Sequence, residues 1–338
     1  MPEAAQVPPE GQLMQAMFGF MVSRGVAAAA ELNVADALRD GPLYYTELAK
    51  AVGADQRALH RVMRMLTAVG VFAEPEPGKY ALNEVSELLR NDNPASFRDM
   101  AAMITSESHW MPWGRLTDTL RSGKSGPQHA FGTDIFAWFQ RDENKDQWNL
   151  FNAAMTSFST ATSQAVAESY DFSGCRKIVD IGGGHGFLLK SILGKAPQAR
   201  GVLFDLPGVV DGADRDELGE RIEGVGGDFF EAVPGGGDCY TMKHIIHDWS
   251  DDHCRKLLSN VSKVMHPSGS VLVLEIVMPE SPEPHPAKFM DVNMLAMTEG
   301  GCERTEKEYA ALFESSGLAL KAIHPTKSPV SIVEAKKA

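Results

Sequence analysis

The chain has 338 residues, which is long enough for two domains that each have a core. Apolar residues make up 43% and charged residues 23%, a balance that excludes a disordered or collagen-like protein. The formal net charge of −13 disfavours non-specific binding to nucleic acid or to an anionic membrane, so neutral or cationic small partners are favoured.

The sequence shows no clear signal for export or membrane insertion. Its first ten residues carry Glu3 and Glu10 and lack a basic region, which argues against a secretory signal. The longest uncharged run, residues 147–167, has the length of a membrane span but contains several Ser and Thr. The four cysteines include no CxxC pair, so neither a disulfide framework nor a cysteine zinc site is indicated. We expect a cytoplasmic protein that does not engage a membrane.

Helical patterns dominate residues 1–120, the first predicted domain. Residues 14–32 are rich in Met, Phe and Ala and nearly uncharged, and such a surface is costly to expose on a monomer. We expect this segment to be a helix at a subunit interface, so the sequence predicts a homodimer.

The rest of this domain has the order of a winged helix-turn-helix. A short helix at 32–38 precedes a second at 46–52, for which Thr46 is the expected N-cap, and a third runs over 56–68. Two strand-like pieces follow within 71–83, where prolines and a glycine separate them.

Winged modules can bind DNA, and Arg57, Arg61 and Arg64 share one face of the third predicted helix. Residues 1–90, however, hold eight Lys and Arg against eleven Asp and Glu, a net charge of 8 − 11 = −3. A DNA-reading domain is normally basic. We therefore predict no nucleic-acid binding, and a winged-helix regulator that senses a small ligand remains an alternative.

Short apolar strands alternate with helices over residues 176–338, the last predicted domain. The strands are expected within KIVDI, GVLFDL, DCYTMKHII and SVLVLEIVM. This alternation indicates an α/β protein with a doubly wound, largely parallel sheet. Residues 121–175 form a predicted helical linker that contributes to a substrate pocket.

The segment DIGGGHG, residues 180–186, lies between the first of these strands and a helix. Its glycines would let the backbone approach a ligand closely. The spacing from Gly182 is GxGxG and not the dinucleotide pattern GxGxxG, because position 187 is Phe. A nucleotide-like ligand and a simple tight turn are both consistent with this loop alone.

Two carboxylates at later strand ends favour the ligand. Asp205 ends GVLFD and could accept two hydrogen bonds from a ribose diol, although it could instead cap the helix before Pro207. Asp228 follows two glycines and precedes Phe229, which suits an adenine amino group and an aromatic ring on the base. Together these elements predict a nucleoside site that lacks a phosphate-binding lysine motif.

Six motifs occur in an order that resembles one family, the S-adenosylmethionine-dependent small-molecule O-methyltransferases of plant caffeate and isoflavone type and their bacterial relatives. They are FNAAM, VDIGGGHG, FDLPGVV, GGDFF, MKHIIHDWSDDHC and GGCERTEKEY. The resemblance implies a Rossmann-like methyltransferase domain behind a winged-helix dimerisation domain, with S-adenosylmethionine as the cofactor. It also implies that Gly182 contacts the methionine part, Asp205 the ribose, Asp228 and Phe229 the adenine, and that Lys243 lies beside the cofactor.

His247 is the candidate base, because it follows the fourth predicted strand, where ligands of an open α/β sheet gather. Methyl transfer from a sulfonium to a phenol needs little covalent help but does need a proton acceptor, and histidine titrates near neutral pH. A capping or core histidine is the alternative. His244 completes an HxxH pattern, but residues three apart on a strand point to opposite faces, so no metal site is predicted.

Two glutamates complete the family pattern. Glu275 lies in an apolar run, and a buried carboxylate there demands a partner. Glu303 follows two glycines and could simply be a solvated loop acid. The resemblance implies that both bracket the histidine, orient its ring and stabilise the imidazolium.

The resemblance also implies an acceptor pocket, whose expected residues are Phe151, Met155, Phe158, Met294 and Thr298. Plant relatives often have a histidine at the position of Phe158, so this pocket is expected to be more apolar. A phenol-like aromatic acceptor is the first expectation, ahead of carotenoid or indole alcohols. Hydroxylase or decarboxylase chemistry on the same fold is an alternative, although such relatives would lack the base.

Overall fold

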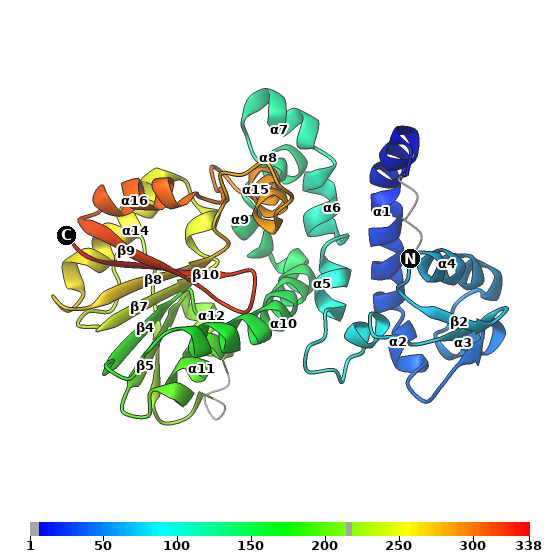
Figure 1. Ribbon diagram of the computed structural model, residues 1–338, viewed down its shortest axis with the longest axis horizontal. Coiled ribbons are helices and arrows are strands. Elements are labelled where there is room, and N and C mark those ends of the chain that lie inside the picture. The colour runs from blue at the N-terminus through cyan, green and yellow to red at the C-terminus, as the bar shows by residue number, and fades with distance from the viewer. Residues whose placement is uncertain (1–6, 214–217) are drawn as a thin grey trace, which may run out of the picture. The chain divides into compact units, whose positions relative to one another are not determined.

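The computed structural model describes residues 7–213 and 218–338, apart from the side chains of Phe158, Thr160 and Ala161. Its internal contacts divide the chain into two compact units (Figure 1). Unit 1 comprises Met1–Trp110 and Gln140–Ser157, and unit 2 comprises Met111–Phe139 and Phe158–Ala338. Residues of the expected helical linker, 121–175, therefore occur in both units.

Unit 1 contains the winged helix-turn-helix that the sequence predicts. Its three-stranded sheet has the order β1-β3-β2, with β1 before α3 and with β2 and β3 after α4, and both strand pairs are antiparallel. The elements that begin in this unit are α1 (Pro9–Glu31), α2 (Val34–Ala37), β1 (Leu43–Tyr44), α3 (Tyr45–Ala51), α4 (Gln56–Ala68), β2 (Ala73–Glu76), β3 (Lys79–Ala81), η1 (Ser86–Leu89), α5 (Arg98–Met103), α6 (Glu107–Trp113), η2 (Asp142–Asn144) and α10 (Lys145–Ser169).

The start of α3 differs from the prediction. Its N-cap is Tyr44 and not Thr46, because the Glu47 carboxylate accepts the backbone N–H of Tyr44 at 3.1 Å. Glu47 thus serves as the N3 residue and starts the helix earlier. Helix α4 has the bounds that the sequence predicts, and its N-cap Asp55 accepts the N–H of Ala58.

Helix α1 carries an uncovered apolar face within its unit. Its buried positions lie in the second half, whereas the first half exposes large apolar side chains, namely Leu13, Met14, Met17, Phe18, Phe20 and Met21. Among the described helices, α1 is the one that is long and apolar enough to cross a membrane by length and composition. The sequence analysis had instead considered residues 147–167 as the longest uncharged run, and these residues lie in α10.

Unit 2 is built on a seven-stranded sheet of order β6-β5-β4-β7-β8-β10-β9. The pairs among β6, β5, β4, β7 and β8 are parallel, and β10 pairs antiparallel with both β8 and β9. The strands are β4 (Lys177–Ile181), β5 (Arg200–Asp205), β6 (Ile222–Gly226), β7 (Cys239–Lys243), β8 (Ser270–Glu275), β9 (Leu318–Pro325) and β10 (Ser331–Lys337). The doubly wound prediction is confirmed, and β6, β9 and β10 are additions to it.

Helices lie on both faces of this sheet (Figure 1). One apolar core includes side chains of α14 and α16, and a second, on alternate residues of the strands, includes side chains of α10 and α11. The helical elements that begin in unit 2 are α7 (Leu116–Ser122), α8 (Gly126–Phe131), α9 (Ile135–Phe139), α11 (Phe187–Lys195), α12 (Pro207–Gly212), η3 (Ile246–Asp248), α14 (Asp251–Val264), α15 (Pro286–Met297) and α16 (Glu306–Glu314). The carboxyl ends of β6, β5, β4 and β7 consequently lie side by side, where parallel sheets bind ligands.

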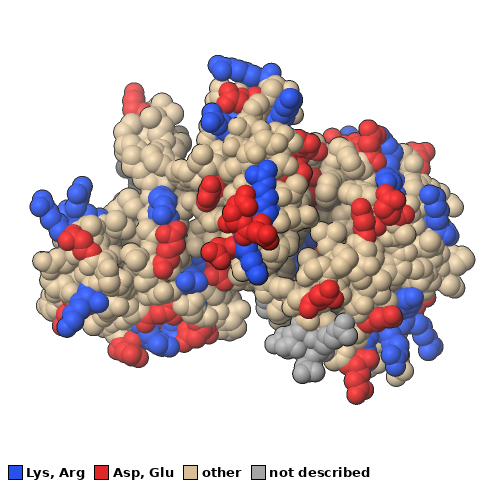
Figure 2. Space-filling view, turned by 180° about the vertical axis from the view of Figure 1, so that it is seen from behind, with Lys and Arg blue, Asp and Glu red and all other residues tan. Residues whose placement is uncertain are grey.

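The charged side chains are mixed over the face that Figure 2 shows. Lysines and arginines there are interspersed with aspartates and glutamates. This distribution gives no support on that face to the regulator alternative, which needs a continuous basic surface.

Candidate active site

The glycine loop directly follows β4 and is tightly packed on one side. A Cβ at Gly182 would lie 2.3 Å from Cδ1 of Ile245, and one at Gly183 would lie 2.4 Å from Cδ1 of Leu203. Gly184 differs, because it has a φ of +56° and a Cβ there would meet no atom within 4 Å. The loop thus requires glycine and presents open space at its tip, which fits a bound ligand.

Asp205 links this loop to the end of β5. Its Oδ2 accepts the N–H of Gly184 at 2.8 Å, and its Oδ1 accepts the N–H of Leu206 at 2.7 Å. Burial raises the pKa of Asp205, and the two backbone hydrogen bonds oppose that rise. The N-cap of α12 is Leu206, so Asp205 is not the helix cap that the sequence left open. Each carboxylate oxygen retains a lone pair for a further donor.

Asp228 lies beside Asp205 at the neighbouring strand end. Gly226 pairs with Asp205 in the register of β6 and β5, and Asp228 comes two residues later. The Asp228 carboxylate accepts the N–H of Phe230 at 2.8 Å, and the Phe229 ring lies 4.6 Å from that of Phe230. An acceptor and an aromatic residue therefore follow one another at this strand end, and their contact with an adenine stays a prediction.

Lys243 ends β7 and has a buried amine. Its Nζ donates to the hydroxyls of Ser159 and Ser163 on α10. Burial lowers the pKa of Lys243 to about 8, although the charge of nearby Asp180 opposes this shift. Lys243 thus lies at the same sheet edge as the glycine loop.

Asp180 supplies a test of whether the site suits S-adenosylmethionine. Its Oδ1 accepts the hydroxyl of Thr241 at 2.7 Å, but its buried Oδ2 has no hydrogen-bond partner among the described residues. A buried acceptor of this kind calls for a donor. The cofactor that the resemblance implies carries an ammonium group, a ribose diol and an adenine amine, and the glycine loop with its neighbouring carboxylates fits those groups.

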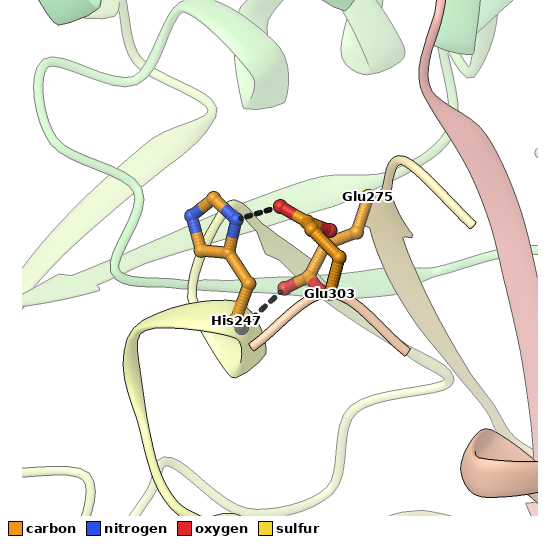
Figure 3. A group of neighbouring side chains, drawn as sticks. All are labelled: His247, Glu275 and Glu303. Carbon is orange, nitrogen blue, oxygen red and sulfur yellow. Dashed lines mark hydrogen bonds and ion pairs between the residues drawn. The ribbon is translucent and has the colours of Figure 1, made fainter. Parts of the chain in front are cut away.

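His247 lies in η3 and is only 5% exposed. Figure 3 shows its ring directed at Glu303, with an Nδ1–Oε1 distance of 2.8 Å. Glu275 instead accepts the backbone N–H of His247 at 3.0 Å and the hydroxyl of Tyr309 at 2.6 Å. The buried Glu275 therefore has the partners that the sequence demanded. It holds the backbone of His247 and not the ring, which corrects the expectation that both glutamates orient the imidazole.

The HxxH argument also needs correction. His244 has a φ of +54° just after β7 ends, so the chain turns into η3 and does not continue as a strand. The rings of His244 and His247 consequently lie 5.1 Å apart and do not point to opposite faces. Burial lowers the pKa of His244 well below its ordinary value, and the charges of His247 and Lys243 act in the same direction.

The group formed by His247, Glu275 and Glu303 could by spacing hold a metal ion, because its ligand atoms lie within 4.8 Å of one another. Both oxygens of Glu275 and one oxygen of Glu303 already accept hydrogen bonds. Those interactions compete with metal binding, and the expectation of no metal stays a prediction.

The electrostatics of the site increase the basicity of His247. Burial disfavours its protonated form, but Asp248, the hydrogen bond to Glu303 and the charge of Glu275 outweigh burial and raise the pKa of His247 to about 9. Burial raises the pKa of Asp248 to about 6 and also raises that of Glu303. An imidazolium at this position is thus strongly stabilised.

Two of the residues expected to line the acceptor pocket lie at the end of α15, close to the segment that carries His247. Met294 and Thr298 are both buried, and the Thr298 hydroxyl donates to the Met294 carbonyl at 2.8 Å. A Cβ on Gly301 would clash with both Thr298 Oγ1 and the His247 carbonyl, which shows how closely these segments approach. Phe151 and Met155 lie in unit 1, and the side chain of Phe158 lies outside the described residues.

Several residues that shape the site had no role assigned from the sequence. Asp248 Oδ1 lies 3.6 Å from His247 Nε2, and Asp291 accepts the N–H of Glu303 at 3.0 Å. The Tyr309 hydroxyl donates to Glu275, and Arg304 donates to the backbone carbonyls on either side of His247 and Asp248. The signal that could have found three of them is their place in the motifs that contain His247 or Glu303. These three are Asp248, Arg304 and Tyr309.

Two family models match the chain. Residues 113–319 match the O-methyltransferase domain, and residues 14–92 match the O-methyltransferase dimerisation domain. The chain belongs to the O-methyltransferase family. This O-methyltransferase depends on S-adenosylmethionine, as the resemblance implied, and has the Rossmann-like catalytic fold expected for it.

Relatives of this O-methyltransferase act on different acceptors. A phenazine O-methyltransferase of Lysobacter antibioticus is 37% identical over 337 residues, 98% of each chain. A phenazine-1-carboxylate N-methyltransferase of Pseudomonas aeruginosa is 36% identical over 316 residues, 92% of each chain. The crystal structure of an O-methyltransferase from neocarzinostatin biosynthesis, in complex with S-adenosylmethionine and 2-hydroxy-5-methyl naphthoic acid, has a TM-score of 0.81 and 30% identity over 99% of this chain and 100% of that one.

Proposed function

We propose that this O-methyltransferase methylates the hydroxyl of a small, phenol-like aromatic acceptor and that His247 is the general base. The observation that carries the proposal is the hydrogen bond between His247 Nδ1 and Glu303. It fixes the ring and directs the other ring nitrogen, Nε2, away from Glu303 (Figure 3). Nε2 lies 3.6 Å from Asp248, beyond hydrogen-bond distance, so it is the atom proposed to meet the acceptor hydroxyl.

The proposed chemistry assigns each residue a task. When bound, the cofactor would supply a methyl group on a positively charged sulfur, and the sulfur–methyl bond would break to leave a neutral thioether without covalent help from the protein. His247 Nε2 takes the hydroxyl proton as the oxygen lone pair forms the bond to carbon. Glu303 holds Nδ1–H, and Asp248 stabilises the imidazolium charge. The proton remains on His247 after transfer and leaves to solvent before the next turnover.

The pKa of His247 indicates which class of acceptor hydroxyl the histidine can deprotonate. Proton transfer between two groups is easiest when their pKa values are similar, and a phenol has a pKa of about 10. The pKa of His247 is about 9, which suits a phenol far better than an aliphatic alcohol. A nitrogen acceptor with a free lone pair would not need this base. The presence of His247 therefore favours an oxygen atom, and not a nitrogen atom, as the site of methylation.

The cofactor residues and the acceptor residues remain part of the proposal. Gly182, Asp205, Asp228, Phe229 and Lys243 are proposed to hold S-adenosylmethionine, which their shared position at adjoining strand ends supports. The proposed acceptor contacts are Phe151, Met155, Phe158, Met294 and Thr298. Methionines and aromatic rings suit flat aromatic ligands.

We further propose that the enzyme is a cytoplasmic homodimer. The match of residues 14–92 to a dimerisation domain supports this state, and so does the exposed apolar face of α1. Burial of that face against a second subunit removes the need for a membrane to cover it.

A panel of small acceptors tests the proposed function. The protein is incubated with S-adenosylmethionine and one of three acceptors of similar shape, which carry a phenol, an aliphatic alcohol or an aromatic amine. Formation of S-adenosylhomocysteine and of the methylated product is measured. Turnover on phenols alone supports the proposal, whereas equal or faster turnover on the amines contradicts the proposed acceptor.

A further inference from the structure

Arg304 directly follows Glu303 and is one of the most deeply buried charged side chains, with 1% exposure. Its Nη1 donates to the carbonyl of Ile246 at 3.0 Å, and its Nη2 donates to the carbonyl of Trp249 at 2.9 Å. Nε and Nη2 both donate to the Asp251 carboxylate, at 3.0 and 2.8 Å. The guanidinium thus holds these two carbonyls and one carboxylate at the same time, and Nη1 also makes a longer hydrogen bond of 3.4 Å to the Cys302 carbonyl.

The two carbonyls flank the residues that the mechanism uses. Only His247 and Asp248 lie between Ile246 and Trp249 in the chain. Cys254 Sγ lies 3.2 and 3.4 Å from the same two carbonyls, but a thiol is a weak donor. Arg304 is therefore the strong donor that holds both ends of the segment that carries the proposed base.

The neighbouring residue holds the other part of the histidine. The Glu303 carboxylate accepts a hydrogen bond from Nδ1 of the His247 ring. Arg304 donates to the backbone carbonyls on both sides of His247. Gly301 keeps these segments in close contact, because a Cβ there would lie 2.4 Å from the His247 carbonyl. Residues 301–304 thus connect the ring and the backbone of His247 to a single short stretch of chain.

We propose that Arg304 is a positioning residue that fixes His247 against Glu303 and toward the acceptor. The inference rests on the proposed role of His247 as the base, and it adds the group that holds the base in place. Arginine suits this task because its planar guanidinium presents several donors in a fixed geometry. A lysine keeps the positive charge but is a single point donor, so it cannot bind both carbonyls and Asp251 in the same way.

Loss of this contact has a consequence for protonation as well as for geometry. The titratable groups that act on the His247 ring are Asp248, Glu303 and Glu275, through their charges, and His244, whose ring lies 5.1 Å away. The three carboxylates raise the pKa of His247, and His244 is held neutral by burial. If the segment shifts away from Glu303, the hydrogen bond to Nδ1 weakens and the pKa of His247 falls.

The test compares Arg304→Lys with a matched control, Arg255→Lys. Arg255 lies on α14 in an exposed ion pair with Asp252, so it shares the residue type but not the contacts. We expect Arg304→Lys to lower kcat by about 10- to 100-fold, the loss typical of a displacement on the order of 1 Å. KM for S-adenosylmethionine should change less than about threefold, and the control should match the wild type.

The second readout is the titration of His247 itself, followed by NMR in protein with labelled histidine and assigned with a His247→Gln variant. Arg304→Lys should move this titration to lower pH, while Arg255→Lys should leave it in place. An unmoved titration would overturn the proposal, and together with a lower kcat it would mean that Arg304 supports the fold only. A moved titration with an unchanged kcat would keep the positioning role of Arg304 and would contradict His247 as the base.

A buried arginine can be essential for folding, so a milder variant accompanies it. Asp251→Asn weakens the carboxylate contact that aligns the guanidinium while keeping the size of the side chain. It should lower kcat by about 3- to 10-fold and move the His247 titration in the same direction, as a partial loss of one charge-assisted contact does. If Arg304→Lys does not fold and Asp251→Asn behaves as the wild type in both readouts, positioning by Arg304 is rejected. The titration does not depend on turnover, so it decides the role of Arg304 even if His247 proves not to be the base.

Discussion

The ring nitrogen Nδ1 of His247 lies 2.8 Å from Oε1 of Glu303, and both side chains are buried (Figure 3). A carboxylate in this position selects one orientation of the imidazole and stabilises its protonated form. The same pairing leaves Glu275 for the backbone N–H of His247. Ring and backbone are thus held by different acids, and they are expected to respond differently to substitution.

Glu303→Gln should show how much of the effect of Glu303 on turnover comes from its negative charge and how much from the size of its side chain. The amide keeps the size of the side chain but lacks the negative charge, so the imidazolium loses much of its stabilisation. Turnover should fall by about 10- to 100-fold, while the affinity for S-adenosylhomocysteine should stay within about threefold. Steady-state kinetics and calorimetric titration measure the two quantities. Glu306→Gln, at an exposed position in α16, is the control, and wild-type turnover in Glu303→Gln would contradict the assigned role.

The rate should increase with pH on the alkaline side of neutrality. His247 accepts a proton only when it is neutral, and its pKa is raised to about 9, so the active form grows as the pH rises toward that value. Asp248→Asn removes one charge that raises this pKa and should move the inflection of kcat/KM to lower pH. A rate profile that is flat from pH 7 to 10, or an inflection that Asp248→Asn leaves unmoved, would be inconsistent with this assignment.

Cofactor binding should depend on the Asp205 carboxylate. If it accepts from the ribose diol, Asp205→Ala removes hydrogen bonds to a charged group that each contribute about 1.5–3 kcal/mol. The Kd for S-adenosylhomocysteine should therefore increase by at least about tenfold. Asp211→Ala, at an exposed position of α12, provides a control of the same type. Calorimetry that finds equal affinities for the two variants would remove Asp205 from the site.

Assembly should depend on the apolar face of α1. Phe18→Asp places a charge among exposed apolar side chains, and we expect it to shift the protein from dimer to monomer in sedimentation velocity. Gln15→Asp adds the same charge at an exposed position that is not part of the apolar face, so it should leave the dimer intact. A wild-type protein whose mass is that of a monomer at all concentrations would refute the homodimer.

The sequence predicted those parts of the fold that local patterns determine. The 3.6-residue periodicity of α4 and the apolar runs of β4, β5, β7 and β8 appear at the expected positions. Strands β9 and β10 were missed, because polar residues interrupt them and the pairing of β10 with β8 is a long-range property. The start of α3 was misplaced because a glutamate at the N3 position outweighed a threonine as the signal for the cap.

The site was predicted as a set of residues, but its internal contacts were not. The motifs placed His247, Glu275 and Glu303 together, and the structure confirms their proximity. The sequence could not show that His244 has a positive φ and that the chain turns there, which brings the two histidine rings together. Nor could it show that Glu275 binds backbone or that Arg304 holds the flanking carbonyls, because these contacts depend on how separate loops approach one another.

His247→Ala gives the most direct test of the central claim. The measurement is the rate of methyl transfer to one phenol acceptor as a function of pH, with the affinity for S-adenosylhomocysteine measured in parallel. We expect unchanged cofactor affinity and a loss in turnover of roughly two to four orders of magnitude at neutral pH. The loss should shrink as the pH approaches about 10, where the phenol ionises in solution and no longer needs an enzymic base. Methylation by His247→Ala at the wild-type rate at neutral pH would contradict the account and leave proximity of the reactants, or another residue, as the source of catalysis.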